Sequence, residues 1–251
     1  MTRAAPALGL ALALAAAACG GSSGGKPAAQ PDEARTRTPR VPVGDGEPED
    51  GVVIASEHGR MDTAVVEAGI EPHKAGLGAC YTSRVGARRW LGGRVSIHWD
   101  IKRDGTIAAV KLAESDLGAW PIEKCLREVA RAATFGKPIG GDADFAIPLE
   151  FSARGRHADW DEAGAQKAVG RQLAALDACM KAKEVKGPAP DDVTITLYVG
   201  PQGKPQSVGF ASPRSVLDDA WADCAEKAAL AWKLPDPKGE IAKLAIRYPA
   251  P

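Results

Sequence analysis

Four of the five cysteines form two pairs with the same internal spacing. Cys80 and Cys125 are 45 residues apart, and so are Cys179 and Cys224; the second pair follows the first by 99 residues. Thiols can form disulfides, bind metals or stay reduced, so these side chains are the first candidates for chemistry. A spacing that recurs at a fixed period also indicates that one structural unit occurs twice in the chain. We therefore expect two copies of one small domain.

The fifth cysteine, Cys19, follows a segment typical of secretory signals. Arg3 precedes an apolar run over residues 7–18, which is too short to span a bilayer as a mature helix. The sequence Ala-Ala-Ala-Cys19-Gly20 resembles a bacterial lipobox, although Ala16 stands where leucine is commonest. The resemblance implies a signal peptide over residues 1–18 and a lipid on Cys19; the alternative is cleavage before a free thiol. By the same resemblance to bacterial lipoproteins, Gly20 after the cysteine implies sorting to the outer membrane, with the protein facing the periplasm.

An oxidising compartment favours disulfides for the other four cysteines. Each copy has roughly 90 residues, a size at which a core gives only modest stability. A Cys80–Cys125 bond would tie two helices that cover the same sheet face, and Cys179–Cys224 would do so in the second copy. Closing such a loop contributes about 4 kcal/mol on the chain-entropy estimate. Four buried free thiols are the alternative, while a zinc site is disfavoured by the absence of short ligand spacings.

The remaining titratable residues do not form a recognisable catalytic pattern. The four histidines, His58, His73, His98 and His157, share no metal-ligand spacing. His98 and Asp100 lie on one face of one predicted strand, but an acid and base pair also needs a pocket and a third group. The sequence has no phosphate loop, nucleophile elbow or dinucleotide fingerprint. We predict no enzyme activity, no cofactor and no metal. Equal numbers of basic and acidic residues, 32 each, argue against nucleic acid.

The first copy is predicted to fold as helix, strand, strand, helix and strand. The segments with these periodicities are residues 62–84, 95–102, 107–112, 121–135 and 144–151. We expect Pro72 to break the first helix, because proline lacks the amide hydrogen that the helix interior needs. Asp104-Gly105 is expected to form the hairpin turn between the first two strands, since both residues tolerate positive φ.

The second copy repeats this order. Residues 193–199 follow residues 95–101 by 98 positions, and the offset returns to 99 at Cys224, as a one-residue gap in a loop would produce. Its first helix is expected over residues 161–183. The predicted fold is α+β, with two tandem domains over residues 60–153 and 158–251, each a small antiparallel sheet covered by two helices. Residues 19–59, rich in Gly, Pro and charge, are expected to be a flexible linker.

Several motifs of the first copy resemble those of a known family. They are Leu77-Gly78-Ala79-Cys80-Tyr81, Gly93-Arg94-Val95, Ile101 with Asp104-Gly105, Ser115, Ile122-Glu123-Lys124-Cys125, Phe135 with Pro138 and Gly140-Gly141, and Ile147-Pro148-Leu149-Glu150-Phe151. Together they resemble the AgmX/PglI C-terminal domain, which is similar in layout to the TonB and TolA C-terminal domains. The second copy departs from the pattern at Met180, Arg214-Ser215 and Leu234, and we interpret it as a degenerate repeat.

The resemblance implies a non-catalytic adaptor that contacts another cell-envelope protein, in gliding motility or in a transport complex. TonB-like domains bind partners by adding a strand at a sheet edge. Pro148 and Pro249 each remove a backbone donor from the last strand of a copy, which fits an edge strand but also protects it against pairing. The alternative function is a periplasmic module that binds cell-wall glycan or another ligand through polar residues between the domains.

Overall fold

The computed structural model describes residues 58–248, apart from positions 161 and 189. The expected signal peptide, Cys19, the predicted linker as far as residue 57 and Pro249 all lie outside the described residues. No helix in the described part of the chain is both long enough and apolar enough to cross a bilayer. The fold is mixed α+β, with two small sheets and several helices.

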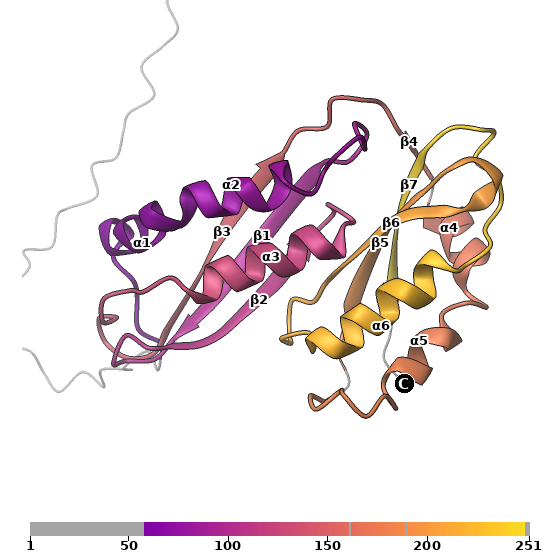
Figure 1. Cartoon of the computed structure of the whole chain (residues 1–251). Helices are drawn as coiled ribbons and strands as arrows, with labels where there is room; N and C mark the ends of the chain where they lie inside the picture. Colours follow the sequence, from indigo (N-terminus) through magenta and orange to yellow (C-terminus); the bar gives the residue numbers. More distant parts are fainter. Residues whose placement is uncertain (1–57, 161, 189, 249–251) are drawn as a thin grey trace, which may run out of the picture. The chain divides into compact units, whose positions relative to one another are not determined.

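The N-terminal half, residues 58–157, contains three helical segments followed by strands and a further helix in the predicted order. Its elements are α1 Thr63–Ile70, η1 Glu71–His73, α2 Lys74–Thr82, β1 Gly93–Ile101, β2 Ile107–Ser115, α3 Trp120–Arg131 and β3 Ala143–Phe151. The sheet order is β2-β1-β3 and both pairings are antiparallel. Helices α2 and α3 lie side by side over one face of this sheet (Figure 1).

β1 is the central strand of the N-terminal sheet, and every second side chain along it is buried. Val95, Ile97 and Trp99 are all 0% exposed, because they face the helices. The Trp99 indole Nε1 donates a hydrogen bond to the Ala130 carbonyl oxygen of α3 at 3.0 Å, which fixes the helix over the sheet. The predicted break at Pro72 is confirmed, since residues 71–73 form a short 3-10 segment between α1 and α2.

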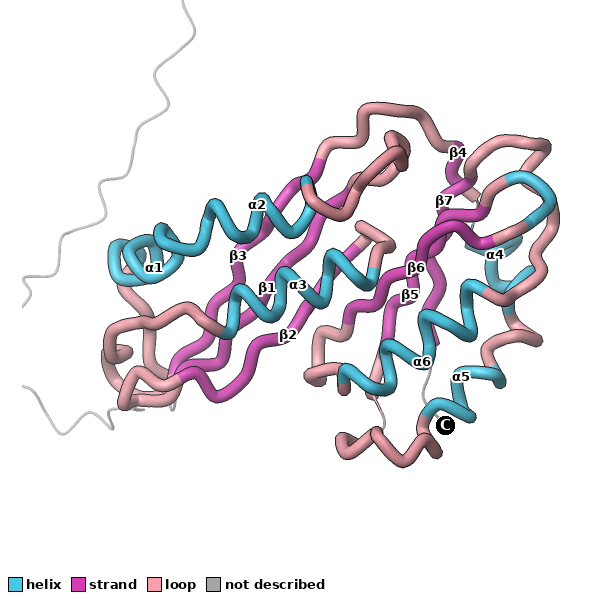
Figure 2. Tube along the Cα trace, in the orientation of Figure 1, coloured by secondary structure: helices cyan, strands magenta, loops and turns pink. Residues whose placement is uncertain are grey.

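The C-terminal half, residues 158–248, has the same order of main elements with one added strand. Its elements are β4 Ala158–Asp159, α4 Glu162–Val169, α5 Ala174–Cys179, β5 Val193–Val199, η2 Pro201–Gly203, β6 Pro205–Ala211, α6 Asp219–Leu230 and β7 Ala242–Tyr248. The sheet order is β4-β7-β5-β6. Figure 2 shows its helices and strands in the same view as Figure 1. The described residues of both halves belong to one compact unit.

Two expectations for the C-terminal half are wrong. The single helix expected over residues 161–183 is divided into α4 and α5, and the second of these ends at Cys179. The division follows Gly170, because glycine is a poor helix former, and Gln172 turns away to donate its side-chain amide to the Lys233 carbonyl oxygen at 2.7 Å. The sheet is also not purely antiparallel, since the two-residue strand β4 pairs parallel to β7.

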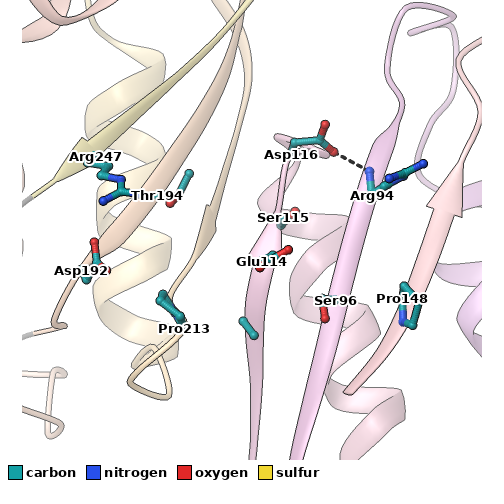
Figure 3. Close-up of a pocket in the computed structure, with 11 residues that line it drawn as sticks. Arg94, Ser96, Glu114, Ser115, Asp116, Pro148, Asp192, Thr194, Pro213 and Arg247 are labelled. Atoms are coloured by element: carbon teal, nitrogen blue, oxygen red, sulfur yellow. Dashed lines mark hydrogen bonds between the residues drawn. The ribbon is translucent and has the colours of Figure 1, made fainter. Parts of the chain in front are cut away.

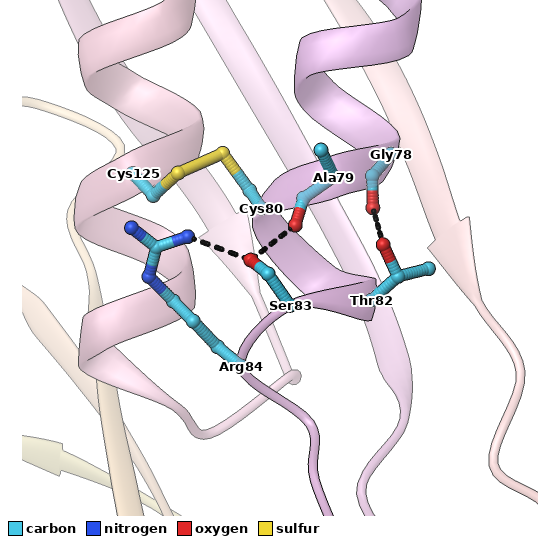
Figure 4. Close-up of a disulfide and its surroundings, with 7 residues drawn as sticks. All are labelled: Gly78, Ala79, Cys80, Thr82, Ser83, Arg84 and Cys125. Carbon is cyan, nitrogen blue, oxygen red and sulfur yellow. Dashed lines mark hydrogen bonds between the residues drawn. A yellow bond between two sulfur atoms is a disulfide. The ribbon is translucent and has the colours of Figure 1, made fainter.

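The two predicted disulfides are present. Cys80–Cys125 joins α2 to α3, and Cys179–Cys224 joins α5 to α6. The Cα–Cα distance is 5.7 Å in both bonds. Figure 4 shows the first bond crossing between the two helices that cover the N-terminal sheet. Each half therefore has a covalent link within its helical layer.

Candidate functional site

The C-terminal sheet packs its non-helical face against the N-terminal half. Tyr198 and Thr196 of β5 and Ser207 of β6 alternate with the core residues of their strands, yet they are only 0%, 1% and 3% exposed. The Tyr198 hydroxyl donates to the Gly92 carbonyl oxygen at 2.7 Å, and the Ser207 hydroxyl donates to the Gly118 carbonyl oxygen at 2.6 Å. Thr196 donates in the same way to the Ser115 carbonyl oxygen at 3.3 Å. A face that would otherwise be hydrated is thus buried and hydrogen-bonded.

Glu123 of α3 lies at the centre of this interface and is 0% exposed. One carboxyl oxygen accepts a hydrogen bond from the Ser115 hydroxyl at 2.6 Å, and the other accepts from the Phe210 backbone amide of β6 at 2.8 Å. Burial raises the pKa of Glu123 to about 7, although these hydrogen bonds act in the opposite direction. The carboxyl group therefore links a strand of each half through α3.

Arg127, one helical turn further along α3, is the second buried charge. Its guanidinium donates to the Leu217 carbonyl oxygen at 2.6 Å, forms an ion pair with Asp219 and lies 5.1 Å from the ring centroid of Trp120. Burial lowers the pKa of Arg127 to about 10, so it stays charged at neutral pH. Because Asp219 begins α6, this ion pair holds α3 against the corresponding helix of the other half.

A second carboxylate of α6 completes the contact between the helices. Asp223 accepts a hydrogen bond from the Trp120 indole at 2.7 Å and forms an ion pair with the Lys124 ammonium at 2.8 Å. The sheets also meet, because the Ser212 backbone amide, just after β6, donates to the Leu112 carbonyl oxygen of β2 at 2.8 Å. The halves are thus joined by their facing edge strands as well as by their helices.

A groove of about 520 Å³ opens between the halves beside these contacts (Figure 3). Its charged lining comes from both sides: Arg94, Glu114 and Asp116 from the N-terminal half, and Asp192 and Arg247 from the C-terminal half. The backbone amide of Arg94 donates to the Asp116 carboxylate, as the dashed line in Figure 3 shows. A groove that presents both signs of charge can bind the alternating donors and acceptors of a peptide or another polar ligand.

The outer strand β3 borders the same groove. Within the described residues, β3 has a hydrogen-bonded strand neighbour only on its β1 side. Asp144, Ala146, Pro148 and Glu150 alternate along it and are exposed. Pro148 pairs in register with Ser96 and also lines the groove, so the proline predicted to mark an edge strand lies on one. The unpaired edge of β3 faces away from β1, whereas the C-terminal wall of the groove lies on the β2 side of the sheet. A free edge of nine residues has the form that strand addition requires.

The other candidate residues of the sequence are placed as follows. His98 and Asp100 lie on the open face of the N-terminal sheet, where His98 Nε2 is 3.0 Å from Asp100 and 3.5 Å from Asp144. The Lys111 ammonium lies 3.6 Å from the Asp100 carboxylate, so the four side chains form a polar network. Across the described ranges, no group of three or more His, Cys, Asp or Glu residues is arranged to hold a metal ion. His58 does not lie in a free linker, because it forms a β-bridge with Asp142.

The roles of Glu123 and Arg127 were not expected from the sequence. The two residues are four positions apart on α3, next to the apolar residues that face the core. A charged residue at the border of the apolar face of a helix is a sequence signal for a buried charge, and α3 carries an acid and a base at that border. Two partners of these side chains, Phe210 and Leu217, belong to the C-terminal half, and the local sequence of α3 does not indicate them.

No protein-family model matches the chain, and the searches of curated proteins and of solved structures returned no match. The resemblance of the first copy to the AgmX/PglI C-terminal domain therefore stays a prediction. The site described above is accordingly defined by its geometry: a β3 edge strand, a mixed-charge groove and a buried polar contact that fixes one half against the other.

Proposed function

We propose that the protein is a non-catalytic adaptor of the bacterial cell envelope that binds a partner protein at the β3 edge. The observation that carries the proposal is the unpaired side of β3, a nine-residue edge that has no strand neighbour among the described residues. The backbone donors and acceptors of an added strand would supply affinity, while the exposed side chains of β3 would select its sequence. Pro148 limits the pairing segment to the residues before it, because proline has no amide hydrogen to donate.

We propose in addition that a lipid on Cys19 holds the adaptor at the outer membrane, facing the periplasm. The lipobox-like sequence and the two disulfides support this placement, since disulfides form in oxidising compartments. Mass spectrometry of the amino-terminal peptide from intact cells is expected to show loss of residues 1–18 and an acylated Cys19. An uncleaved amino terminus or a free Cys19 thiol would contradict this part of the proposal.

The family assignment belongs to the same proposal. We infer that the halves are tandem TonB-like domains of the AgmX/PglI type, the second of them degenerate. Support comes from the shared order of helix, strand, strand, helix and strand, and from a disulfide at the equivalent place in each half. The resemblance connects the protein with motility or transport complexes.

Site-specific cross-linking in cells tests the adaptor function. A photo-crosslinking amino acid in place of Ala146, which is exposed on β3, is expected to capture one protein partner. The matched control replaces Ala75, which is exposed on α2, and is expected to capture none. The variant Ala146→Pro should abolish the complex, because it removes a backbone donor from the edge. Equal capture at Ala75, or none at Ala146, would refute partner binding at β3.

The groove favours a second candidate function, in which the protein binds cell-wall glycan. Its polar lining from both halves can hydrogen-bond sugar hydroxyl groups and the peptide stems of peptidoglycan. Sedimentation with purified peptidoglycan, lost in the groove variant Asp192→Ala but kept in Ala75→Ser, would support this function. The adaptor function is favoured over it if the protein stays in the supernatant while the β3 cross-link forms.

A further inference from the structure

Five arginines gather on two loops near the Cys80–Cys125 disulfide. Residues 83–92 contain Arg84, Arg88 and Arg89, and residues 152–157 contain Arg154 and Arg156. Neither loop contains an aspartate or a glutamate, although acidic and basic residues are equally numerous in the chain, 32 of each. The positive charge is therefore a local concentration and not a property of the whole protein.

Backbone hydrogen bonds hold the two loops together. The backbone amides of Arg154 and Gly155 both donate to the Arg89 carbonyl oxygen, at 2.8 Å and 2.6 Å. A side chain at Gly155 would come within 3.2 Å of the Arg89 and Trp90 backbone, so this close approach favours glycine. The structure thus fixes two arginines next to each other that are far apart in the sequence.

A hollow of about 350 Å³ lies where the loops meet, and Arg89 and Arg154 line it together with Tyr81, Thr82 and Val85. The Tyr81 ring is held in place because it stacks on Phe151, with ring centroids 4.9 Å apart. The Tyr81 hydroxyl donates to the Leu91 carbonyl oxygen at 2.8 Å. The hollow is therefore lined by two arginines beside an aromatic ring that is fixed in place.

Arg88 is the member of this cluster that interacts with a neighbouring acid, the carboxylate of Glu226. Arg88 is half-buried and donates to the Val85 carbonyl oxygen at 3.3 Å, while Arg84 donates to the Ser83 hydroxyl at 3.1 Å (Figure 4). Arg84, Arg89, Arg154 and Arg156 are exposed and form no ion pair with any carboxylate of the described chain, whereas Arg94, Arg103 and Arg214 each have one. Like charges held together repel one another, and a bound anion would relieve that repulsion.

We propose that this hollow binds a phosphate group, with Arg89 and Arg154 as its principal ligands. Guanidinium groups present paired donors that match phosphate oxygens, and a phosphate monoester carries enough negative charge to satisfy more than one of them. The Thr82 hydroxyl already donates to the Gly78 carbonyl oxygen at 3.2 Å, so we do not count it among the phosphate ligands. Tyr81 and Val85 would contact the organic part of a phosphate ester, which free phosphate lacks. The phosphate can come from a lipid headgroup or from a free molecule, and the two sources are separable by experiment.

The test uses the full chain with Cys19→Ser, so that acylation cannot place the protein on a membrane by itself. Titration with inorganic phosphate, followed by calorimetry, is expected to show binding. Arg89→Gln combined with Arg154→Gln should weaken that binding at least about tenfold, because each charged hydrogen bond contributes more than about 1.4 kcal/mol. The control, Arg103→Gln with Arg214→Gln, removes the same charge from exposed arginines elsewhere and should bind as the parent does.

Vesicle flotation identifies the source of the phosphate. Binding to phosphatidylcholine vesicles that contain phosphatidic acid, displaced by inorganic phosphate and lost in the Arg89 and Arg154 variant, supports a lipid headgroup. Binding of inorganic phosphate without vesicle binding supports a free phosphate compound. The proposal is overturned if the parent binds neither, if the control variant loses as much affinity, or if acetate binds as tightly as phosphate. None of these results depends on a partner at β3, so the adaptor function is tested separately.

Discussion

Replacing Glu123 by glutamine should remove much of the pH dependence of folding between about 4.5 and 7. The pKa of Glu123 is raised from 4.5 to about 7 in the folded protein, because the carboxyl group is fully buried. Between those pH values the folded protein keeps a proton that the unfolded chain releases. The stabilisation from this group is therefore complete below pH 4.5 and is lost as the pH rises towards 7.

The change in the free energy of unfolding can be calculated from the difference between the unfolded and folded pKa values of Glu123. Each pH unit between the unfolded and folded pKa corresponds to about 1.4 kcal/mol, so the free energy of unfolding should fall by roughly 3 kcal/mol from pH 4.5 to 7. Glutamine has nearly the same shape and does not titrate. Its amide oxygen can accept from the Phe210 backbone amide while its amide nitrogen donates to the Ser115 hydroxyl oxygen, as the protonated carboxyl group does, so the stability of the variant should stay nearly constant over this pH range.

The free energy of unfolding is measured by urea titration at a series of pH values, with tryptophan fluorescence as the signal and the disulfides intact. The control is Glu128→Gln, which changes an exposed glutamate on the same helix and should keep the slope of the parent. Asp218 and Asp223 have lowered pKa values, so their titration falls in more acidic solution and does not mask the effect. A parent stability that stays constant or rises from pH 4.5 to 7, or a glutamine variant with the parental slope, would refute the reasoning.

Two further predictions concern stability. Replacing Cys80 and Cys125 by serine should lower the free energy of unfolding by about 4 kcal/mol, because the disulfide closes a loop of 45 residues; urea unfolding measures the loss, and an unchanged midpoint would contradict it. Gly209→Ala should destabilise the protein by about 1–3 kcal/mol, because its methyl group would meet the Glu123 carboxylate between the halves. Gly78→Ala is the control, since an added methyl meets nothing within 4 Å there and should leave the melting temperature equal or higher.

The elements with strong local patterns were predictable from the sequence. The alternation along β1 and the pairing of the cysteines follow directly from local patterns in the sequence. The hairpin turn contains Asp104-Gly105 as expected, although only Gly105 has a positive φ and its amide donates to the Lys102 carbonyl oxygen. The division between α4 and α5 was missed because apolar residues recur at helical spacing on both sides of Gly170. Hydrophobic periodicity predicts which face of a helix is apolar. It does not predict at which glycine the helix will be interrupted.

The interface between the halves could not be predicted in the same way. Thr196 and Ser207 stand at polar positions of alternating strands, and such positions normally face water. They are buried only because the other half supplies carbonyl oxygens at the right places. The arginine hollow illustrates the same limit, since the charge of each loop is visible in the sequence while the contact of Arg154 with Arg89 requires the fold.

The hydrogen bonds across the sheet face have an evolutionary consequence. Tyr198, Thr196 and Ser207 all donate from side chains of the C-terminal half, and they all donate to main-chain oxygens of the N-terminal half. Every residue type has a main-chain oxygen, so hydrogen bonding alone does not fix the accepting residues. Space fixes them instead, because an added side chain at Gly92 or Gly118 would come within 3.0 Å of neighbouring atoms. Natural variation should therefore keep the donors for their hydroxyl groups and these two acceptors for their lack of a side chain.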